Sequence, residues 1–334
     1  MTQSSEAFSV ILCAYTEARW SDLIAAVASA QRQTVLPRDI IVVIDHNPAL
    51  LARSRAYFSG VTVIENRGAR GLSGARNSGV AAARGSLIVF LDDDAIAAPD
   101  WLEQLSACYA DPAAIGVGGA IEPRWTARQP RWFPAEFNWV VGCTYRGMPE
   151  RRAAVRNLIG CNMSFRREAF ERMGGFRIGR VGVLSIGQEN DDTEFCIRLT
   201  ASLPDAQLIY QPGARVQHRV PPQRATLAYF ARRCYSEGLS KAYLARLVGH
   251  DRGLSSERDY TLRTLPSGVL RGVIDTLARR DAGGLLRSSA IVAGLAITTA
   301  GYLAGRVAHL MQRRPVVDRA EAQPERSAME QPSA

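Results

Sequence analysis

The sequence contains few lysines and histidines, which many catalytic and phosphate-binding motifs require. Among its 334 residues there is one lysine, Lys241, and there are four histidines. The glycine-rich turn at residues 71–79 lacks the Lys-Ser/Thr pair of a P-loop. The glycine fingerprint of dinucleotide-binding folds is also missing after the first expected strand, which excludes an NAD-dependent oxidoreductase.

The six cysteines are scattered, with no C-x-x-C pair and no zinc-binding spacing. They are Cys13, Cys108, Cys143, Cys161, Cys196 and Cys234. Free thiols in apolar runs are typical of a reducing compartment. The N-terminus has no basic segment followed by an apolar stretch, so no signal peptide is expected. Together these features predict a cytoplasmic protein.

The net charge of +9 is unevenly distributed. Residues 201–314 contain 17 Lys and Arg against 7 Asp and Glu, whereas residues 1–200 are nearly balanced. A local positive field suits an anionic partner such as phospholipid headgroups, a lipid phosphate or nucleic acid. Alternatively, arginine is simply the usual cation of this protein, and the two interpretations stay open.

The first part of the chain alternates between strand and helix patterns. Short apolar runs at residues 8–14, 39–45, 60–65 and 86–91 predict buried strands, and residues 20–33 and 74–83 have helical spacing. This order predicts a mostly parallel sheet with helices on both faces. Such sheets bind ligands at the carboxyl ends of their strands. Residues 115–176, richer in Trp, Pro and Gly, are expected to form irregular strands and loops.

After Pro222 the pattern becomes helical, with amphipathic candidates at residues 225–248 and 267–280. We predict a catalytic domain over residues 1–222, a basic helical region over 223–311 and a disordered tail over 312–334. Ser288–Gly305 contains no charge and is slightly shorter than the ~20 residues of a membrane span. An interfacial or re-entrant helix, a membrane span and a soluble packing helix are the three alternatives, and we favour the first.

Three adjacent carboxylates, Asp92, Asp93 and Asp94, follow the strand that ends at Leu91. In an extended segment Asp92 and Asp94 point one way and Asp93 the other. One face could therefore hold a divalent cation together with substrate phosphates. The alternative is a solvated acidic turn or a helix N-terminus.

A second acidic site, Asp191-Asp192, precedes apolar residues at helical spacing. A carboxylate there either caps the helix or acts as a general base that takes the proton of an attacking hydroxyl. His218 lies in a strand-like segment further on, and its imidazole could serve the cation site. A lone histidine is otherwise more often structural.

Other polar residues stand at strand ends or in turns where a nucleotide would lie. Glu17 follows the first strand and Asp45 ends the second. Arg76, in the turn at 71–79, could neutralise a phosphate. The aromatic side chains between Arg124 and Arg146 either stack on a sugar ring or form core beneath a loop.

Taken in order, these segments resemble an inverting family-2 glycosyltransferase that uses a nucleotide sugar. The resemblance covers residues 8 to about 218. Its carriers are Val10-Ile-Leu-Cys-Ala-Tyr-Thr-Glu17, Ile41-Val-Val-Ile-Asp45, Gly74-Ala-Arg-Asn-Ser-Gly79, Phe90-Leu-Asp-Asp-Asp94, Gly160-Cys-Asn-Met-Ser-Phe-Arg-Arg167, Gly174-Gly-Phe176 and Asp191-Asp-Thr-Glu194.

The resemblance implies a GT-A type fold, a Rossmann-like nucleotide-binding α/β fold with a mostly parallel sheet, followed here by a C-terminal helical appendage. It also implies the residue roles. Asp45 would recognise the base, Glu17 and Arg76 would line the nucleotide site, and Asp92 and Asp93 would contact the nucleotide sugar. Asp92, Asp94 and His218 would hold Mn²⁺ or Mg²⁺. Asp192 would be the catalytic base, although the usual Glu-Asp pair is Asp191-Asp192 here, so Asp191 remains an alternative.

The implied activity is inverting transfer of a sugar from a nucleotide-sugar donor, by family habit a UDP-sugar, to a hydroxyl of a glycan or lipid-linked acceptor. We further expect peripheral contact with an anionic membrane at the cytoplasmic face of the cell membrane, and no nucleic-acid partner. The rival interpretations are a nucleotidyl- or phosphoryl-transferase on the same fold and a non-catalytic nucleotide-binding scaffold at the membrane.

Overall fold

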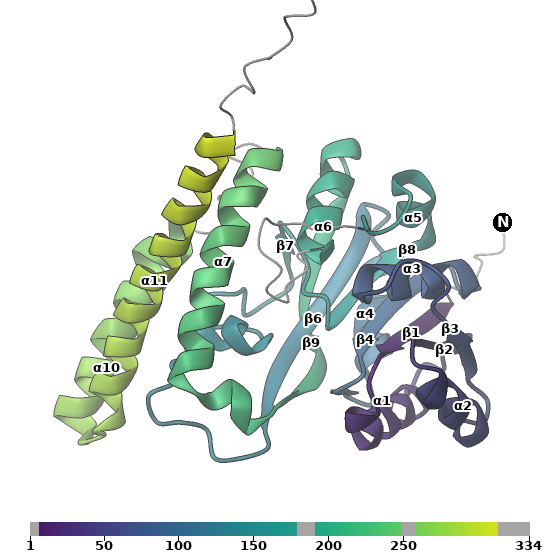
Figure 1. Ribbon diagram of the computed structural model, residues 1–334, viewed down its shortest axis with the longest axis horizontal. Coiled ribbons are helices and arrows are strands. Elements are labelled where there is room, and N and C mark those ends of the chain that lie inside the picture. The colour runs from purple at the N-terminus through teal and green to yellow at the C-terminus, as the bar shows by residue number, and fades with distance from the viewer. Residues whose placement is uncertain (1–6, 179–190, 249–257, 313–334) are drawn as a thin grey trace, which may run out of the picture.

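The computed structural model describes residues 7–178, 191–248 and 258–312 (Figure 1). Its centre is a nine-stranded sheet in the order β3-β2-β1-β4-β8-β6-β9-β5, with β7 paired to β9. The strands are β1 (Phe8–Ala14), β2 (Asp39–Ile44), β3 (Thr62–Glu65), β4 (Leu87–Asp92), β5 (Ala95–Ala97), β6 (Ala114–Trp125), β7 (Ala153–Val155), β8 (Asn162–Arg166) and β9 (Gln207–Val220).

The N-terminal half of the sheet is the predicted parallel part. β1 pairs in parallel with both β2 and β4, and β2 pairs in parallel with β3. Side chains alternate between two buried clusters on the two faces, with Val10 and Leu12 in one and Ile11 in the other. The connecting helices are α1 (Trp20–Gln31), α2 (Pro48–Tyr57) and α3 (Leu72–Ala82), with a 3-10 turn, η1 (Glu17–Arg19), before α1. The predicted fold class is confirmed.

The other half of the sheet is mixed, and it is more regular than the sequence suggested. β8 pairs antiparallel with both β4 and β6, while β6 pairs in parallel with the long strand β9. The register of β6 on β9 shifts between Gly119 and Ala120. A Cβ on Gly119 would collide with the carbonyl oxygen of Ala214, so this close approach requires glycine. The helices here are α4 (Trp101–Tyr109), α5 (Arg167–Met173), α6 (Asp191–Ser202) and the 3-10 segment η2 (Ala135–Val141).

The aromatic residues of the segment 124–146 belong mainly to the core. Phe133 is buried, and Trp125, Trp132 and Trp139 pack against the same cluster. Phe133 also contacts the ring of Phe230, with centroids 5.9 Å apart. These rings therefore contribute to the core.

The C-terminal helices stand side by side along one edge of the molecule, away from β3 (Figure 1). They are η3 (Pro222–Ala225), α7 (Leu227–Val248), the π-helical turn η4 (Tyr260–Thr264), α10 (Leu265–Arg279) and α11 (Gly283–Gln312). Phe230, Leu265 and Ile291 from these helices join the buried cluster that contains Phe137. Apart from Gln312, the tail predicted over 312–334 lies outside the described residues, and the division into domains stays a prediction.

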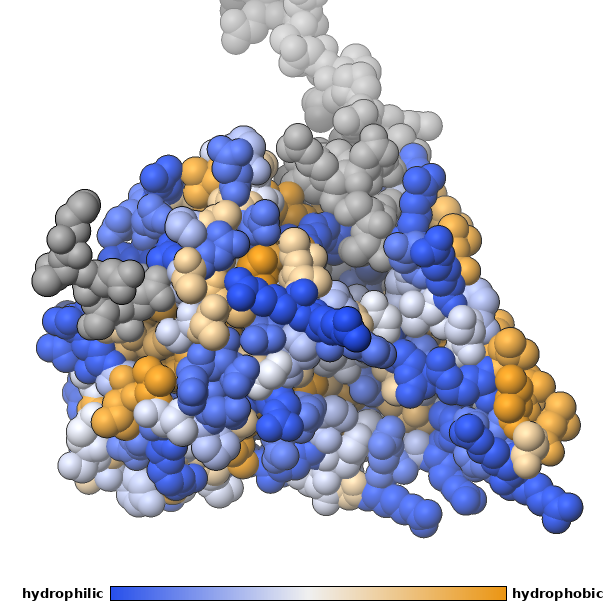
Figure 2. Space-filling model, turned by 180° about the vertical axis from the view of Figure 1, so that it is seen from behind, coloured by the Kyte–Doolittle hydropathy of each residue, from blue (hydrophilic) through white to orange (hydrophobic). Residues whose placement is uncertain are grey.

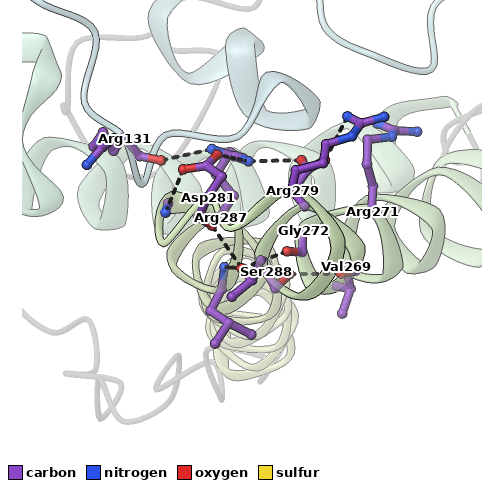
Figure 3. A network of polar contacts seen from close by, with 12 residues as sticks. Arg131, Val269, Arg271, Gly272, Arg279, Asp281, Arg287 and Ser288 are labelled. Atoms are coloured by element: carbon purple, nitrogen blue, oxygen red, sulfur yellow. Dashed lines mark hydrogen bonds and ion pairs between the residues drawn. The ribbon is translucent and has the colours of Figure 1, made fainter.

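A polar network fixes the tight turn between α10 and α11 (Figure 3). Arg287 donates to the carboxylates of Asp275 and Asp281, each at 2.9 Å. The hydroxyl of Ser288 donates to the carbonyl of Val269 at 2.8 Å. These bonds hold the two helices as an antiparallel hairpin.

Candidate active site

The acidic residues predicted from strand ends gather at the carboxyl edge of the parallel strands. Glu17 follows β1, Asp45 follows β2, and Asp92 ends β4. Because β2, β1 and β4 are neighbours in the sheet, these three positions share one edge. The rule that open α/β sheets bind ligands at the carboxyl ends of their strands therefore selected residues that lie together in the fold.

Asp45 is buried and fully engaged by the protein. Its carboxylate accepts hydrogen bonds from the side-chain amide of Asn66 at 2.6 Å and from the backbone N–H of Gly71 at 3.0 Å. It also lies 2.9 Å from Nδ1 of His46. Asp45 thus ties the turn before α3 to the end of β2. Glu17, by contrast, is exposed, and the nearest cation is Arg53 at 3.7 Å.

Arg19 links two of the three consecutive aspartates. Its Nη1 lies 2.8 Å from Oδ1 of Asp93 and 3.3 Å from Oδ2 of Asp94. Burial raises the pKa of Asp93 to about 7, an effect that Arg19 only partly offsets. The other oxygen of Asp93, Oδ2, is buried and has no hydrogen-bond partner among the described residues. The sequence analysis did not single out Arg19.

His218 lies against Asp94, as a shared cation site would require. Its Nε2 is 3.2 Å from Oδ1 of Asp94, and both side chains are buried. Burial disfavours both charges, but it is outweighed by the hydrogen bond and attraction within the pair together with Arg19 near Asp94 and Cys143 near His218: the pKa of Asp94 falls to about 2 and that of His218 rises to about 10. If two ligand atoms bind one ion with bonds of about 2.1 Å that form an angle of about 90°, the two atoms lie about 3 Å apart. The observed separation of 3.2 Å is close to this value, and the proton of the hydrogen bond would leave Nε2 when the imidazole binds a cation.

A second set of possible ligand atoms overlaps the first. A carboxylate oxygen of Asp92, the sulfur of Cys161 and a ring nitrogen of His218 all lie within 4.8 Å of one another. The side chain of Asp92 is one-third exposed, whereas Cys161 and His218 are buried. The structure therefore brings together the predicted ligands Asp92, Asp94 and His218, and it adds Cys161.

Arg76 is buried in an ion pair, which differs from the free phosphate-binding cation expected from the sequence. Its Nη1 donates to both oxygens of Asp191, at 3.1 and 3.0 Å, and Asp191 also accepts from the hydroxyl of Ser73 at 3.0 Å. Nη2 of Arg76 lies 3.9 Å from Oδ1 of Asp92. Arg76 thus joins the two acidic sites, and Asp191 is neutralised within the protein.

Asp192 is partly exposed and differs from Asp191 in its surroundings. Its carboxylate accepts from the backbone N–H groups of Gly160 at 2.9 Å and Thr193 at 2.6 Å. Burial, and then the charge of Asp191, raise the pKa of Asp192 to about 6. A carboxylate with this pKa can accept a proton near neutral pH. A Cβ at Gly160 would come within 2.5 Å of Nη2 of Arg76 and 3.2 Å of Oδ2 of Asp192, so a larger residue there would displace these side chains.

Comparison with known proteins agrees with this architecture. The family model of glycosyl transferase family 2 matches residues 9–174. A glucosyl-dolichyl phosphate glucuronosyltransferase of Haloferax volcanii is 34% identical over 239 residues, covering 70% of this chain and 75% of its own. The succinoglycan biosynthesis protein ExoM of Rhizobium meliloti is 28% identical over 199 residues, covering 59% of this chain and 60% of its own.

The fold also matches a solved structure, that of the mannosyltransferase PcManGT from Pyrobaculum calidifontis in complex with GDP-Man and Mn²⁺. The TM-score is 0.53 at 19% identity, over 88% of this chain and 86% of that one. The family resemblance found in the sequence motifs is confirmed by the family model and by the extent of the 34% identical relative. The chain belongs to glycosyl transferase family 2, and it is a glycosyltransferase.

Proposed function

We propose that the protein transfers a sugar from a nucleotide sugar, by family habit a UDP-sugar, to a hydroxyl of a glycan or lipid-linked acceptor with inversion at the anomeric carbon. One observation carries this proposal. A partly exposed carboxylate with a raised pKa, Asp192, is joined through Asp191 and Arg76 to the carboxylates at the end of β4. This arrangement supports a base beside a diphosphate site.

The donor would lie at the carboxyl ends of β1, β2 and β4, with Glu17, Asp45, Arg76, Asp92 and Asp93 around the nucleotide sugar. Asp92, Asp94 and His218 are the residues that would hold a divalent cation, Mn²⁺ or Mg²⁺. A bound cation of this kind offsets the negative charge that develops on a departing diphosphate. The structurally similar mannosyltransferase, which was solved with GDP-Man and Mn²⁺, supports this assignment.

Asp192 would be the general base. As the acceptor oxygen bonds to the anomeric carbon, its proton passes to the Asp192 carboxylate, and the bond from that carbon to the diphosphate breaks. Attack from the face opposite the leaving group inverts the carbon. Asp191 is less suited to this role, because it is buried and paired with the Arg76 guanidinium, whereas Asp192 is partly exposed. The part of Asp191 would be to hold Arg76 beside the base.

The relative from Haloferax volcanii bears the name of a glucosyl-dolichyl phosphate glucuronosyltransferase, and this supports a lipid-linked acceptor. The surface of the C-terminal hairpin supports a bilayer nearby. Large apolar side chains are exposed along α10 and α11, and Figure 2 shows them gathered at that edge beside strongly hydrophilic side chains. They are Leu270, Ile274, Leu277, Leu285, Leu286, Val292, Leu303 and Val307.

The partner that we propose for this face is the anionic cytoplasmic surface of the cell membrane. Leu270, Ile274 and Leu277 share one side of α10. Arg263 and Arg279 are exposed, each paired with an aspartate four residues earlier, and could exchange these partners for acidic headgroups. Gly283–Ala308 of α11 is the one helix in the described part of the chain that is long and apolar enough to cross a membrane. Because α11 is packed against α7 and α10, contact in the plane of the membrane is favoured over a span.

The rival functions fit less well. A non-catalytic scaffold would tolerate loss of one acidic site, but the carboxylates of both acidic sites are present. A nucleotidyl- or phosphoryl-transferase would be expected to place a lysine on the phosphates, and Lys241 pairs with Glu237 on α7. No nucleic-acid partner is proposed.

Release of the nucleoside diphosphate tests the proposed function. With Mn²⁺ or Mg²⁺ and a panel including UDP-glucose, UDP-glucuronic acid and GDP-mannose, we expect slow, cation-dependent release from a UDP-sugar. Asp94→Asn should lower this release by about a hundredfold or more, because the cation loses a ligand. Asp205→Asn, a matched change at an exposed position after α6, should leave it unchanged. The proposal would be overturned if no donor gave release of nucleoside diphosphate and calorimetry detected binding of none of them.

Vesicle sedimentation tests the membrane surface. The full-length protein should bind vesicles that contain phosphatidylglycerol and should not bind vesicles of phosphatidylcholine alone. Leu277, with 78% of its surface exposed, is the most exposed leucine of α10. Leu277→Asp should weaken binding at least about tenfold, because an apolar side chain no longer enters the lipid. Leu36→Asp, at an equally exposed leucine between α1 and β2, is the control. Equal binding by both variants would contradict the assignment of this surface.

A further inference from the structure

Cys161 lies among the proposed cation ligands, yet the transfer reaction described above gives it no task. Its position follows from the sheet. β4 and β8 pair antiparallel with Leu91 opposite Asn162, so that Cys161, just before β8, comes opposite Asp92, the last residue of β4. The sulfur of Cys161, a carboxylate oxygen of Asp92 and a ring nitrogen of His218 consequently lie within 4.8 Å of one another.

This cluster has one open side. Cys161 and His218 are each 4% exposed, whereas one-third of the Asp92 side chain is accessible. In a tetrahedral site with bonds of about 2.0–2.3 Å, ligand atoms lie about 3.3–3.8 Å apart. The three donors, within 4.8 Å of one another, would have to move closer together to reach that spacing, and Asp92 is the one with an accessible side chain.

A second thiol is close to His218 but on the other side of the ring. The sulfur of Cys143 is 3.8 Å from Nδ1 of His218, whereas Asp94 contacts Nε2. Cys143 therefore orients the imidazole from outside, as partners of metal-binding histidines commonly do. Its substitution distinguishes a thiol that binds the ion from a thiol that only contacts the same histidine.

We propose that Cys161 is a ligand of the cation site together with Asp92 and His218, and that the site therefore binds the thiophilic ions Co²⁺, Zn²⁺ and Cd²⁺ more tightly than Mg²⁺. The inference rests on the proposed function, because it takes Asp92 and His218 as cation-binding residues. Thiolate ligands favour Zn²⁺ and similar ions, whereas an all-oxygen set suits Mg²⁺. The thiol proton leaves to solvent as sulfur binds the ion.

Titration of the full-length protein with Co²⁺ tests the proposal by absorption spectroscopy. Sulfur bound to Co²⁺ gives a near-ultraviolet charge-transfer band, which oxygen and nitrogen ligands do not. We expect this band in the wild type and its loss in Cys161→Ser, with Co²⁺ affinity lowered at least about tenfold. Affinity for Mg²⁺, measured by calorimetry, should change little. Cys143→Ser and Cys108→Ser, the latter a buried thiol of α4, should keep the band.

Several outcomes would overturn the inference. They are no band in the wild type, a band that persists in Cys161→Ser, or equal affinities of the wild type for Co²⁺ and Mg²⁺. If Cys161→Ser fails to fold by circular dichroism, Cys161→Ala and the wild-type competition between Co²⁺ and Mg²⁺ give the answer. Mg²⁺-dependent release of nucleoside diphosphate by the wild type without a Co²⁺ band would refute this inference alone and leave the proposed function standing.

Discussion

Asp192→Asn is expected to lower kcat for sugar transfer by about 10²- to 10⁴-fold, while binding of the nucleotide sugar changes little. Asparagine keeps the size of the side chain, and its carbonyl oxygen can still accept from Gly160 or Thr193. It cannot take up the proton of the acceptor hydroxyl. Steady-state kinetics with a soluble acceptor, together with donor binding by calorimetry, measure the two effects separately.

The pH profile provides an independent test of the same residue. The base must be deprotonated to act, and the pKa of Asp192 is raised to about 6. The rate should therefore fall about tenfold per pH unit below pH 6 and level off above it. The acid limb should be absent from the residual activity of Asp192→Asn, and Asp205→Asn should retain the wild-type profile. A variant Asp192→Asn within threefold of wild-type kcat would exclude Asp192 as the base.

Arg76→Met is expected to lower the free energy of unfolding by about 3–5 kcal/mol, because it leaves Asp191 as a buried charge without its cation. The side chains of Arg76 and Asp191 are only 4% and 2% exposed, and two hydrogen bonds join them. Urea unfolding followed by circular dichroism measures the loss. The double variant Arg76→Met/Asp191→Leu should recover much of it, since an apolar pair of similar volume needs no compensating charge.

Arg84→Met is the matched control for that experiment. Arg84 also pairs with a buried aspartate, Asp39, at 3.1 Å, but 67% of the Arg84 side chain is exposed. The backbone N–H of Arg84 continues to donate to Asp39 after the substitution. The expected loss is therefore about 1 kcal/mol or less. Equal losses in Arg76→Met and Arg84→Met would show that the Arg76–Asp191 pair contributes no more than a surface ion pair.

The parallel half of the sheet could be predicted because its strands are uninterrupted apolar runs. Residues 8–14 and 39–44 are almost entirely buried, so nothing in their sequence competes with the strand pattern. The helix α2 was missed although signals were present. Asn47 caps it by accepting from the N–H of Leu50, and Pro48 occupies its first turn.

The mixed half could not be read from local pattern. The first half of β9 carries Pro212 and Gly213, and β6 carries Gly118 and Gly119, all of which are unfavourable in strands. These strands form because they pair with each other over most of their length, with register shifts between Ala114 and Gly116 and between Gly119 and Ala120. Such pairing depends on segments far apart in the sequence.

The residues of the candidate site were likewise predictable only in part. The carboxylates follow strand ends, where the rule for open α/β sheets directs attention, and the structure brings them together. Arg19 was missed because its partner Asp93 is 74 residues away and no local motif marks the pair. Cys161 was missed because only the register of β8 on β4 places it beside Asp92. Arg76 was identified, but its partner Asp191 could not be known without the fold.

The position of Arg76 between Asp92 and Asp191 has a thermodynamic consequence. Under the proposed roles, a cation held at Asp92 adds positive charge close to the neighbouring carboxylate of Asp192 and so favours its deprotonated form. By reciprocity, loss of the proton from Asp192 tightens the hold on the cation by the same factor. Binding of the cation and deprotonation of Asp192 are then coupled equilibria. An enzyme built in this way is more ready to accept a hydroxyl proton when the cation is bound than when it is absent.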